Sequence, residues 1–303
     1  MKARRAIENV AQNVARNAAI SAIRLIDMTS FSSPIVFIGG GNMASAIMGG
    51  LLRQGASAAA ITVIEPQAGQ AQSLRERLGV AVLPDASAAQ AALARAALVV
   101  WAVKPQVLAQ AAAPVAPRAR QALHLSVAAG IGTDSLARWL GTPRVIRAMP
   151  NTPALIGRGM TGLYARPETS EADRALAAQV MAATGASLWV GEEPLLDAVT
   201  ALSGSGPAYV FYFLEAMQQA GEQMGLPAAD ALRLAIATFD GASALAAQSG
   251  EPPATLRERV TSKGGTTFAA LAALQQAQVA PAFIAAMQAA RERAEQLGRE
   301  FGG

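Results

Sequence analysis

Cysteine is absent from this 303-residue sequence, and histidine occurs once, as His124. The first absence excludes disulfides and thiolate chemistry and is compatible with a reducing cytoplasm, where we expect the protein to act. The second excludes a metal site built from several histidines, so we expect no metal. Lysine is scarce too, with Lys2, Lys104 and Lys263, and a reaction that needs a lysine therefore has few candidates.

Long apolar runs and a strong charge bias are missing as well. No run reaches the length of a membrane-spanning helix, so we expect no membrane partner. The formal net charge is +4, but residues 1–27 carry five basic and two acidic side chains, which leaves about +1 for the rest. With no basic bias and no interleaved aromatic residues, we expect no nucleic-acid partner.

Residues 1–27 have a weakly amphipathic helical pattern without the continuous apolar segment of a secretory signal. Met28 stands shortly before the first predicted strand and is an alternative start. We therefore predict an N-terminal extension, disordered or helical, over residues 1–33.

Short apolar strands alternate with helical segments over residues 34–153. The predicted strands are residues 35–38, 61–64, 80–82, 98–103, 123–127 and 144–149. This alternation predicts a parallel, doubly wound Rossmann-type sheet. Residues 160–165 and 187–190 can also form strands, but the later chain is otherwise helical. We predict an α/β fold with a dinucleotide-binding domain over 34–165 and an all-helical dimerisation domain over 166–303, whose apolar helices face a second subunit.

The first predicted strand leads into a glycine-rich turn. Gly39, Gly41 and Ala44 have the spacing of a dinucleotide-binding turn. In such a turn the first glycine makes the bend, the second admits the pyrophosphate, and the third small residue packs helix on strand. Glu65 ends the second strand, where an acid accepts hydrogen bonds from the ribose diol and repels a 2′-phosphate. The residues thus favour NADH, the alternative being a solvated carboxylate.

Later strand ends would line the same crevice. Lys104 follows the fourth strand, where a solvated lysine and one near the nicotinamide ribose are equally good interpretations. Small or turn-forming stretches follow the next two strands, at residues 126–130 and 149–153. His124 lies inside an apolar strand and is best interpreted as a core histidine.

A second glycine-rich turn, residues 262–267, precedes a helical pattern late in the chain; we call it the late turn. The free N–H groups and the dipole of a helix N-terminus attract an anion. Glycine permits close approach, and hydroxyl side chains add donors. The sequence therefore predicts an anion site there.

Five stretches occur in one order along the chain. They are Phe37-Ile38-Gly39-Gly40-Gly41-Asn42-Met43-Ala44, Ala102-Val103-Lys104-Pro105, Met149-Pro150-Asn151-Thr152-Pro153, Ser203-Gly204-Ser205-Gly206-Pro207-Ala208-Tyr209 and Ser262-Lys263-Gly264-Gly265-Thr266-Thr267. With them the sequence resembles the pyrroline-5-carboxylate reductase family over about residues 34–295. The resemblance implies reduction of L-1-pyrroline-5-carboxylate to L-proline by NAD(P)H, the last step of proline biosynthesis. It also implies a homodimer through the helical domain, and larger rings of dimers occur in the family.

The resemblance also implies roles for individual residues. Ser262, with the backbone N–H groups of Gly265 and Thr266, matches the positions that hold the substrate carboxylate, and Thr267 matches the hydroxyl that bonds the ring nitrogen. Positions that match cofactor contacts are Gly39, Gly41, Asn42, Met43, Ala44, Val103, Lys104, Pro105, Ala129 and Asn151. The family often prefers NADPH, which Glu65 does not fit, so the cofactor is left as NADPH or NADH. Lys263 departs from the proline of many relatives.

No histidine lies in these motifs and the late turn has no carboxylate, so a strong general acid is not evident. Because a cyclic imine can arrive protonated, the protein's task would be orientation. A β-hydroxyacid dehydrogenase needs a helical lysine in its second domain, where the one lysine, Lys263, lies in a glycine turn, so this alternative is disfavoured. Two alternatives stay open. A non-catalytic NAD(P)-sensing protein would not need the late turn, and a reductase of another small cyclic imine carboxylate would share every motif.

Overall fold

The computed structural model describes residues 33–302, so the interpretation of residues 1–27 lies outside the described residues. The chain divides into two compact units. Within the described residues, we call 33–207 together with 287–302 the sheet unit, and 208–286 the helical unit.

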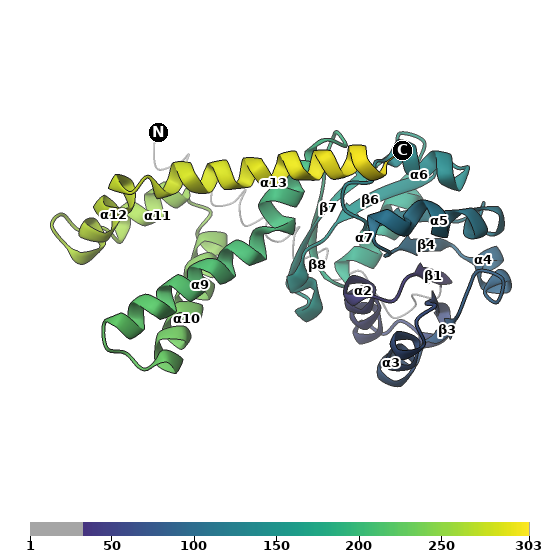
Figure 1. Cartoon of the computed structure of the whole chain (residues 1–303), viewed down its shortest axis with the longest axis horizontal. Coiled ribbons are helices and arrows are strands. Elements are labelled where there is room, and N and C mark those ends of the chain that lie inside the picture. The colour runs from purple at the N-terminus through teal and green to yellow at the C-terminus, as the bar shows by residue number, and fades with distance from the viewer. Residues whose placement is uncertain (1–32, 303) are drawn as a thin grey trace, which may run out of the picture. The chain divides into compact units, whose positions relative to one another are not determined.

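The sheet unit is built on one eight-stranded sheet with the order β3-β2-β1-β4-β5-β6-β7-β8 (Figure 1). The strands are β1 (Ile35–Ile38), β2 (Ile61–Ile64), β3 (Ala81–Leu83), β4 (Leu98–Trp101), β5 (Leu123–Ser126), β6 (Val145–Met149), β7 (Gly159–Ala165) and β8 (Gly185–Trp189). Pairing is parallel from β3 across to β6, β7 is antiparallel to β6, and β8 is parallel to β7. The strand order reverses at β1, which confirms the predicted doubly wound sheet.

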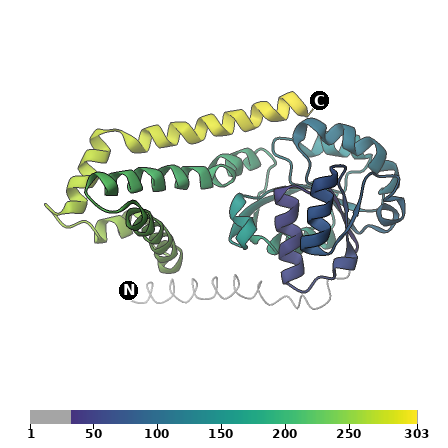
Figure 2. The same ribbon diagram turned by 60° about the horizontal axis from the view of Figure 1, so that its bottom comes forward.

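Two hydrophobic cores lie on opposite faces of this sheet because successive strand residues point to opposite sides. Ile35 and Phe37 join the core of one face, and Val36 and Ile38 join the core of the other. The first face is covered by α2 (Asn42–Arg53), α3 (Ala68–Leu78) and α7 (Glu171–Ala182), and the second by α4 (Gln90–Arg95), α5 (Pro105–Val115) and α6 (Thr133–Leu140). Figure 2 shows α2 and α3 side by side on their face.

The sheet continues past residue 165, where we predict the domain boundary. The predicted strand at 187–190 forms as β8 and pairs with β7, with Gly159 opposite Gly185. The end of α13 (Val279–Phe301) also belongs to the sheet unit, since Arg138 of α6 donates to the Gly302 carbonyl at 3.0 Å. The two units therefore divide after Pro207, and the helical unit is shorter than the predicted helical domain.

The helical unit holds most of α9 (Gly206–Gln223), then α10 (Ala228–Ser249), α11 (Pro253–Arg259), α12 (Thr266–Gln276) and the start of α13. Phe283 of α13 meets Tyr209 and Phe213 of α9 edge-on, with ring centroids 5.6 and 5.5 Å apart. Few side chains are buried within the unit, and α11 and α12 bury none. Large apolar side chains stand exposed instead, among them Phe211, Tyr212, Met224, Leu234 and Phe268.

Among residues 33–302, no single helix is long and apolar enough to cross a membrane. Taken together, α12 and α13 are long and apolar enough for one span, but the two helices are bent by 54° and the match is one of length and composition alone.

His124 is a core histidine, as its place in an apolar strand predicts. Its ring is fully buried, and Nδ1 accepts a hydrogen bond from Trp101 Nε1 at 3.0 Å. Burial lowers the pKa of His124 to about 4, against an opposing effect of the Ala119 backbone. The side chain is therefore neutral near pH 7 and has no part in any of the sequence motifs.

The buried His124 predicts a loss of stability in mild acid. In the unfolded chain the imidazole regains its ordinary pKa, so the unfolded state takes up the proton first as the pH falls. The free energy of unfolding should be unaffected by this group above about pH 6.5 and should decrease by about 3 kcal/mol down to about pH 4. Urea unfolding across this range measures the effect. His124→Asn, which keeps an acceptor for Trp101, should flatten the curve; an unchanged curve would contradict the assignment.

Candidate active site

The predicted cofactor positions of the sheet unit all follow the carboxyl ends of parallel strands. They come after β1, β2, β4, β5 and β6, which are consecutive in the sheet and so end along one edge. The reversal of strand order beside β1 opens the crevice where dinucleotides bind in such sheets. The structure thus brings these positions to one edge of the sheet.

The glycine turn, residues 39–41, has the backbone that the spacing predicts. Gly39 has φ +90°, and a Cβ there would lie 2.9 Å from both the Ala102 carbonyl oxygen and Val103 Cγ1. A Cβ on Gly41 would meet no atom within 4 Å, so the space beside it is open. Because the first helical bond of α2 runs from Ser45 N to the Gly41 carbonyl, the N–H groups of Asn42, Met43 and Ala44 have no partner within the helix.

The third small position, Ala44, is fully buried against the sheet in the first core. Open space beside Gly41, bare N–H groups and an apolar third position fit a bound pyrophosphate at the start of α2.

Glu65 is not a solvated carboxylate. It is 9% exposed, Oε2 accepts the Gly40 N–H and Oε1 accepts the Gln67 N–H, both at 2.9 Å. A Cβ on Gly40 would collide with Leu74 Cδ1 and lie 3.3 Å from Oε2. A side chain at the middle glycine would therefore press on Leu74 of α3 and on the Glu65 carboxylate. The motif spacing singles out only the two flanking glycines, so this role is not readable from the spacing.

The next strand ends present a mixture of polar and small groups. Lys104 is exposed at the N-cap of α5, and Pro105 is the first residue of that helix. Val103 packs against the glycine turn, and Ala129 is half-buried in the turn after β5.

Asn151 is anchored by the protein on both sides of its amide. Nδ2 lies 3.2 Å from both the carbonyl and the hydroxyl oxygen of Ser203, and Oδ1 accepts the Met160 N–H at 2.9 Å. Ser203 lies in a π-helical turn, Thr200–Gly204, that precedes α9. Two motifs that read separately in the sequence, at residues 149–153 and 203–209, are therefore bonded to one another. The Asn151 amide has one hydrogen-bond acceptor site left, on Oδ1, so its side chain can form at most one further hydrogen bond with a cofactor.

The late turn forms the N-terminus of α12 in the helical unit. Gly264 has φ +74°, and Gly265 is the N-cap with no side-chain cap. The first helical bond runs from Ala269 N to the Gly265 carbonyl, which leaves the N–H groups of Thr266 and Thr267 without a partner inside α12.

One predicted donor of the late turn is already used. The Gly265 N–H donates to the Ser262 carbonyl at 3.0 Å, closing the turn, so it is not presented to a ligand as predicted. Within residues 33–302 the hydroxyls of Ser262 and Thr267 form no hydrogen bond with the protein. The donors available at this helix end include these hydroxyls and the N–H groups of Thr266 and Thr267.

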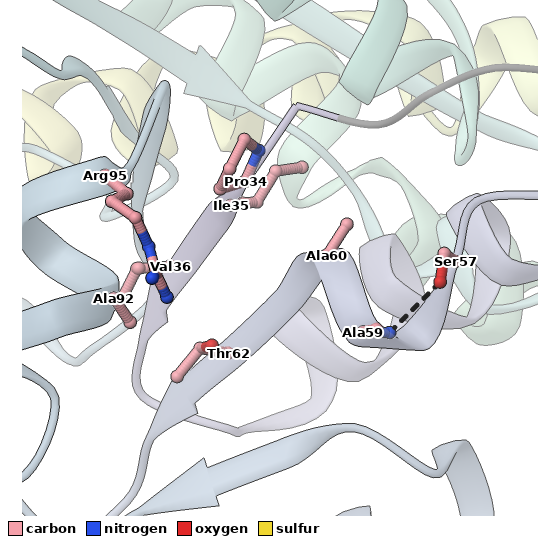
Figure 3. Close-up of a pocket in the computed structure, with 9 residues that line it drawn as sticks. All are labelled: Pro34, Ile35, Val36, Ser57, Ala59, Ala60, Thr62, Ala92 and Arg95. Atoms are coloured by element: carbon pink, nitrogen blue, oxygen red, sulfur yellow. Dashed lines mark hydrogen bonds between the residues drawn. The ribbon is translucent and has the colours of Figure 1, made fainter.

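A shallow pocket of about 420 Å³ lies elsewhere, at the amino ends of β1 and β2 (Figure 3). Pro34, Thr62 and Arg95 are among the residues that line it. This edge is opposite the one that carries the glycine turn, so the pocket is separate from the candidate cofactor site. In the described part of the chain, no three His, Asp or Glu side chains are grouped to hold a metal ion.

Comparison with known protein families gives two matches. The model described as pyrroline-5-carboxylate reductase dimerisation matches residues 193–297. The model described as NADP oxidoreductase, coenzyme F420-dependent, matches residues 34–130. Pyrroline-5-carboxylate reductase from Pseudomonas aeruginosa is 45% identical over 271 residues, covering 88% of this chain and 98% of the relative. The Escherichia coli enzyme of that name is 35% identical over 268 residues, covering 88% and 98%.

Solved structures agree with these matches. A pyrroline-5-carboxylate reductase from Coxiella burnetii superposes with a TM-score of 0.81 at 36% identity, covering 88% of this chain and 98% of that one. The Plasmodium falciparum pyrroline carboxylate reductase, solved with NADP bound, superposes at 0.79 with 24% identity over 88% and 98%, and shows the shared fold.

Proposed function

Because this chain belongs to the pyrroline-5-carboxylate reductase family, we propose that it reduces the C=N bond of L-1-pyrroline-5-carboxylate with NAD(P)H, forming L-proline in the last step of proline biosynthesis. The observation that carries the proposal is the late turn, residues 262–267. It lies inside the matched dimerisation region and presents unpaired N–H and hydroxyl donors at the start of α12.

The test is oxidation of NADH and of NADPH by the purified full chain with L-1-pyrroline-5-carboxylate. Turnover with either cofactor supports the proposal. No turnover with both overturns it. The six-membered cyclic imine carboxylate serves as a second substrate, and faster turnover with it would favour the reductase of another imine.

The bound nicotinamide cofactor supplies the hydride, and the described residues fit such a cofactor. The open space beside Gly41 and the N–H groups of Asn42 and Met43 are suited to its pyrophosphate, and Glu65 to its ribose. Val103, Lys104, Pro105 and Ala129 follow β4 and β5 at the same sheet edge and would line the nicotinamide side.

In the helical unit, the late turn would bind the substrate through two of its groups. The Ser262 hydroxyl and the Thr266 N–H would hold the carboxylate at the positive end of the α12 dipole. The Thr267 hydroxyl oxygen would accept a hydrogen bond from the N–H of the iminium ring, which keeps its proton and is held in place for hydride transfer. Since residues 261–267 include no Asp, Glu or His, the turn orients the substrate rather than protonating it.

Lys263 predicts a salt-dependent affinity for this anionic substrate. Its ammonium is exposed one residue after Ser262 and would add attraction that dissolved salt screens. Lys263→Met should raise the KM for L-1-pyrroline-5-carboxylate about threefold at low ionic strength, as for an exposed charge pair. Arg257→Met, on exposed α11, is the matched control with the same loss of charge. An equal salt dependence of KM in the wild type and Lys263→Met would contradict this role.

The exposed apolar surface of the helical unit supports a homodimer. In this unit α11 and α12 bury no side chain, and Phe211, Tyr212 and Met224 are more than half exposed, which is typical of a surface that another subunit covers. We infer that a second copy covers it, and that the dimer can build a larger ring. Light scattering of the full chain tests the assembly: a monomer at micromolar concentration would overturn it, and a dimer without larger species would exclude the ring.

A further inference from the structure

Glu65 combines a fixed position with unused capacity to accept hydrogen bonds. Each carboxylate oxygen can accept two hydrogen bonds, and each here has one from the backbone, of Gly40 or of Gln67. One acceptor site therefore remains on each oxygen. The two hydroxyls of a vicinal diol could fill them together, which is the geometry that an adenosine ribose offers.

The negative charge of this carboxylate is not neutralised by a cation. None of the ion pairs formed within residues 33–302 includes Glu65. Its partners are neutral backbone N–H groups, and the side chain is 9% exposed, so solvent screens the charge poorly. A 2′-phosphate placed at this ribose would meet a like charge at short range.

Among the described residues, the segment that follows Glu65 supplies no cation to offset that repulsion. Residues 66–74 contain neither lysine nor arginine. Gln70, in the first turn of α3, donates to the Gly40 carbonyl, and Arg75 donates to the Val82 carbonyl at 2.8 Å. Lys104 follows β4, which is separated from β2 by β1. The groups named here therefore provide no positive charge to bind a 2′-phosphate, and the Glu65 carboxylate would repel it.

We propose that Glu65 makes NADH the preferred cofactor of this chain over NADPH. The kinetic part of this inference rests on the proposed function, whereas the preference in cofactor binding does not. It departs from what the NADP-named family model and the NADP-bound Plasmodium relative would suggest by analogy.

The test is a fluorescence titration of the full chain with NADH and with NADPH, without substrate, together with kcat/KM for each. We expect the wild type to bind NADH at least about tenfold more tightly than NADPH. Glu65→Ser removes the charge and makes room for a phosphate, so NADPH should bind more tightly and the preference should fall to about one or reverse. Glu65→Gln removes the charge with little change of shape, and it should also lower the preference.

Glu76→Gln is the matched control, since it removes an exposed carboxylate on α3, the helix that follows Glu65, and should leave the ratio unchanged. Thermal unfolding of each variant shows whether the Gly40 contact is still supported; if Glu65→Ser does not unfold cooperatively, Glu65→Gln decides. Equal or tighter binding of NADPH by the wild type, or an unchanged ratio in Glu65→Gln, would overturn the inference. Strong NADH preference without turnover of L-1-pyrroline-5-carboxylate would leave it intact and overturn the proposed function instead.

Discussion

Thr267→Val is expected to lower kcat for L-1-pyrroline-5-carboxylate by about 100-fold, the usual effect of removing one preorganised polar group at a reacting centre. Valine keeps the branched shape, so α12 should start in the same way, but the hydroxyl that would hold the ring nitrogen is gone. That hydroxyl forms no hydrogen bond with the protein within residues 33–302, so its loss leaves no buried partner unsatisfied. Steady-state kinetics with the preferred cofactor provide the measurement.

The same variant should bind the nicotinamide cofactor as the wild type does, since the glycine turn and Glu65 are untouched. Thr267→Ser restores the hydroxyl and should recover most of the turnover. The melting temperature of Thr267→Val should stay close to the wild-type value, because the residue is only half-buried at an exposed helix end. If kcat changes by less than about threefold, Thr267 has no place in the reaction.

Strand positions were predictable where the pattern is local. β1 and β2 lie where the apolar runs place them, at Ile35–Ile38 and Ile61–Ile64. The predicted strand at 98–103 is too long, because its neighbour β1 ends at Ile38 and leaves the chain beyond Ala102 without a partner. A strand persists only while a neighbour accepts its hydrogen bonds, and that limit depends on β1, 63 residues earlier, rather than on the apolar run itself.

The contacts that link distant stretches were not predictable. The Asn151 amide meets Ser203 across 52 residues, and the Glu65 carboxylate caps the Gly40 N–H across 25. No periodicity in the sequence predicts either pair, because each contact forms only when the folded sheet brings two loops together. The hydrogen bond from the Gly265 N–H to the Ser262 carbonyl was not predictable for a different reason. It accompanies a positive φ at Gly264, which a glycine permits but does not require.

Gly185→Ala is expected to destabilise the protein by roughly 3–5 kcal/mol, because backbone strain and collision act together. Gly185 begins β8 with φ +138°, which residues with a side chain rarely adopt. A Cβ there would lie 2.6 Å from Gly159 N and 2.9 Å from Gly159 C, and closer still to the carbonyl oxygen. These are backbone atoms of the paired strand β7, so relief requires the two strands to separate.

Gly191→Ala is the matched control, because a Cβ on Gly191 meets nothing within 4 Å and its φ is ordinary. It follows β8 by two residues and should change the free energy of unfolding by less than about 0.5 kcal/mol. Urea unfolding of both variants with the wild type separates collision from a general effect of replacing glycine in this segment. Equal stability of the two variants would mean that β8 is not held against β7 at Gly159, and that the edge of the sheet ends at β7.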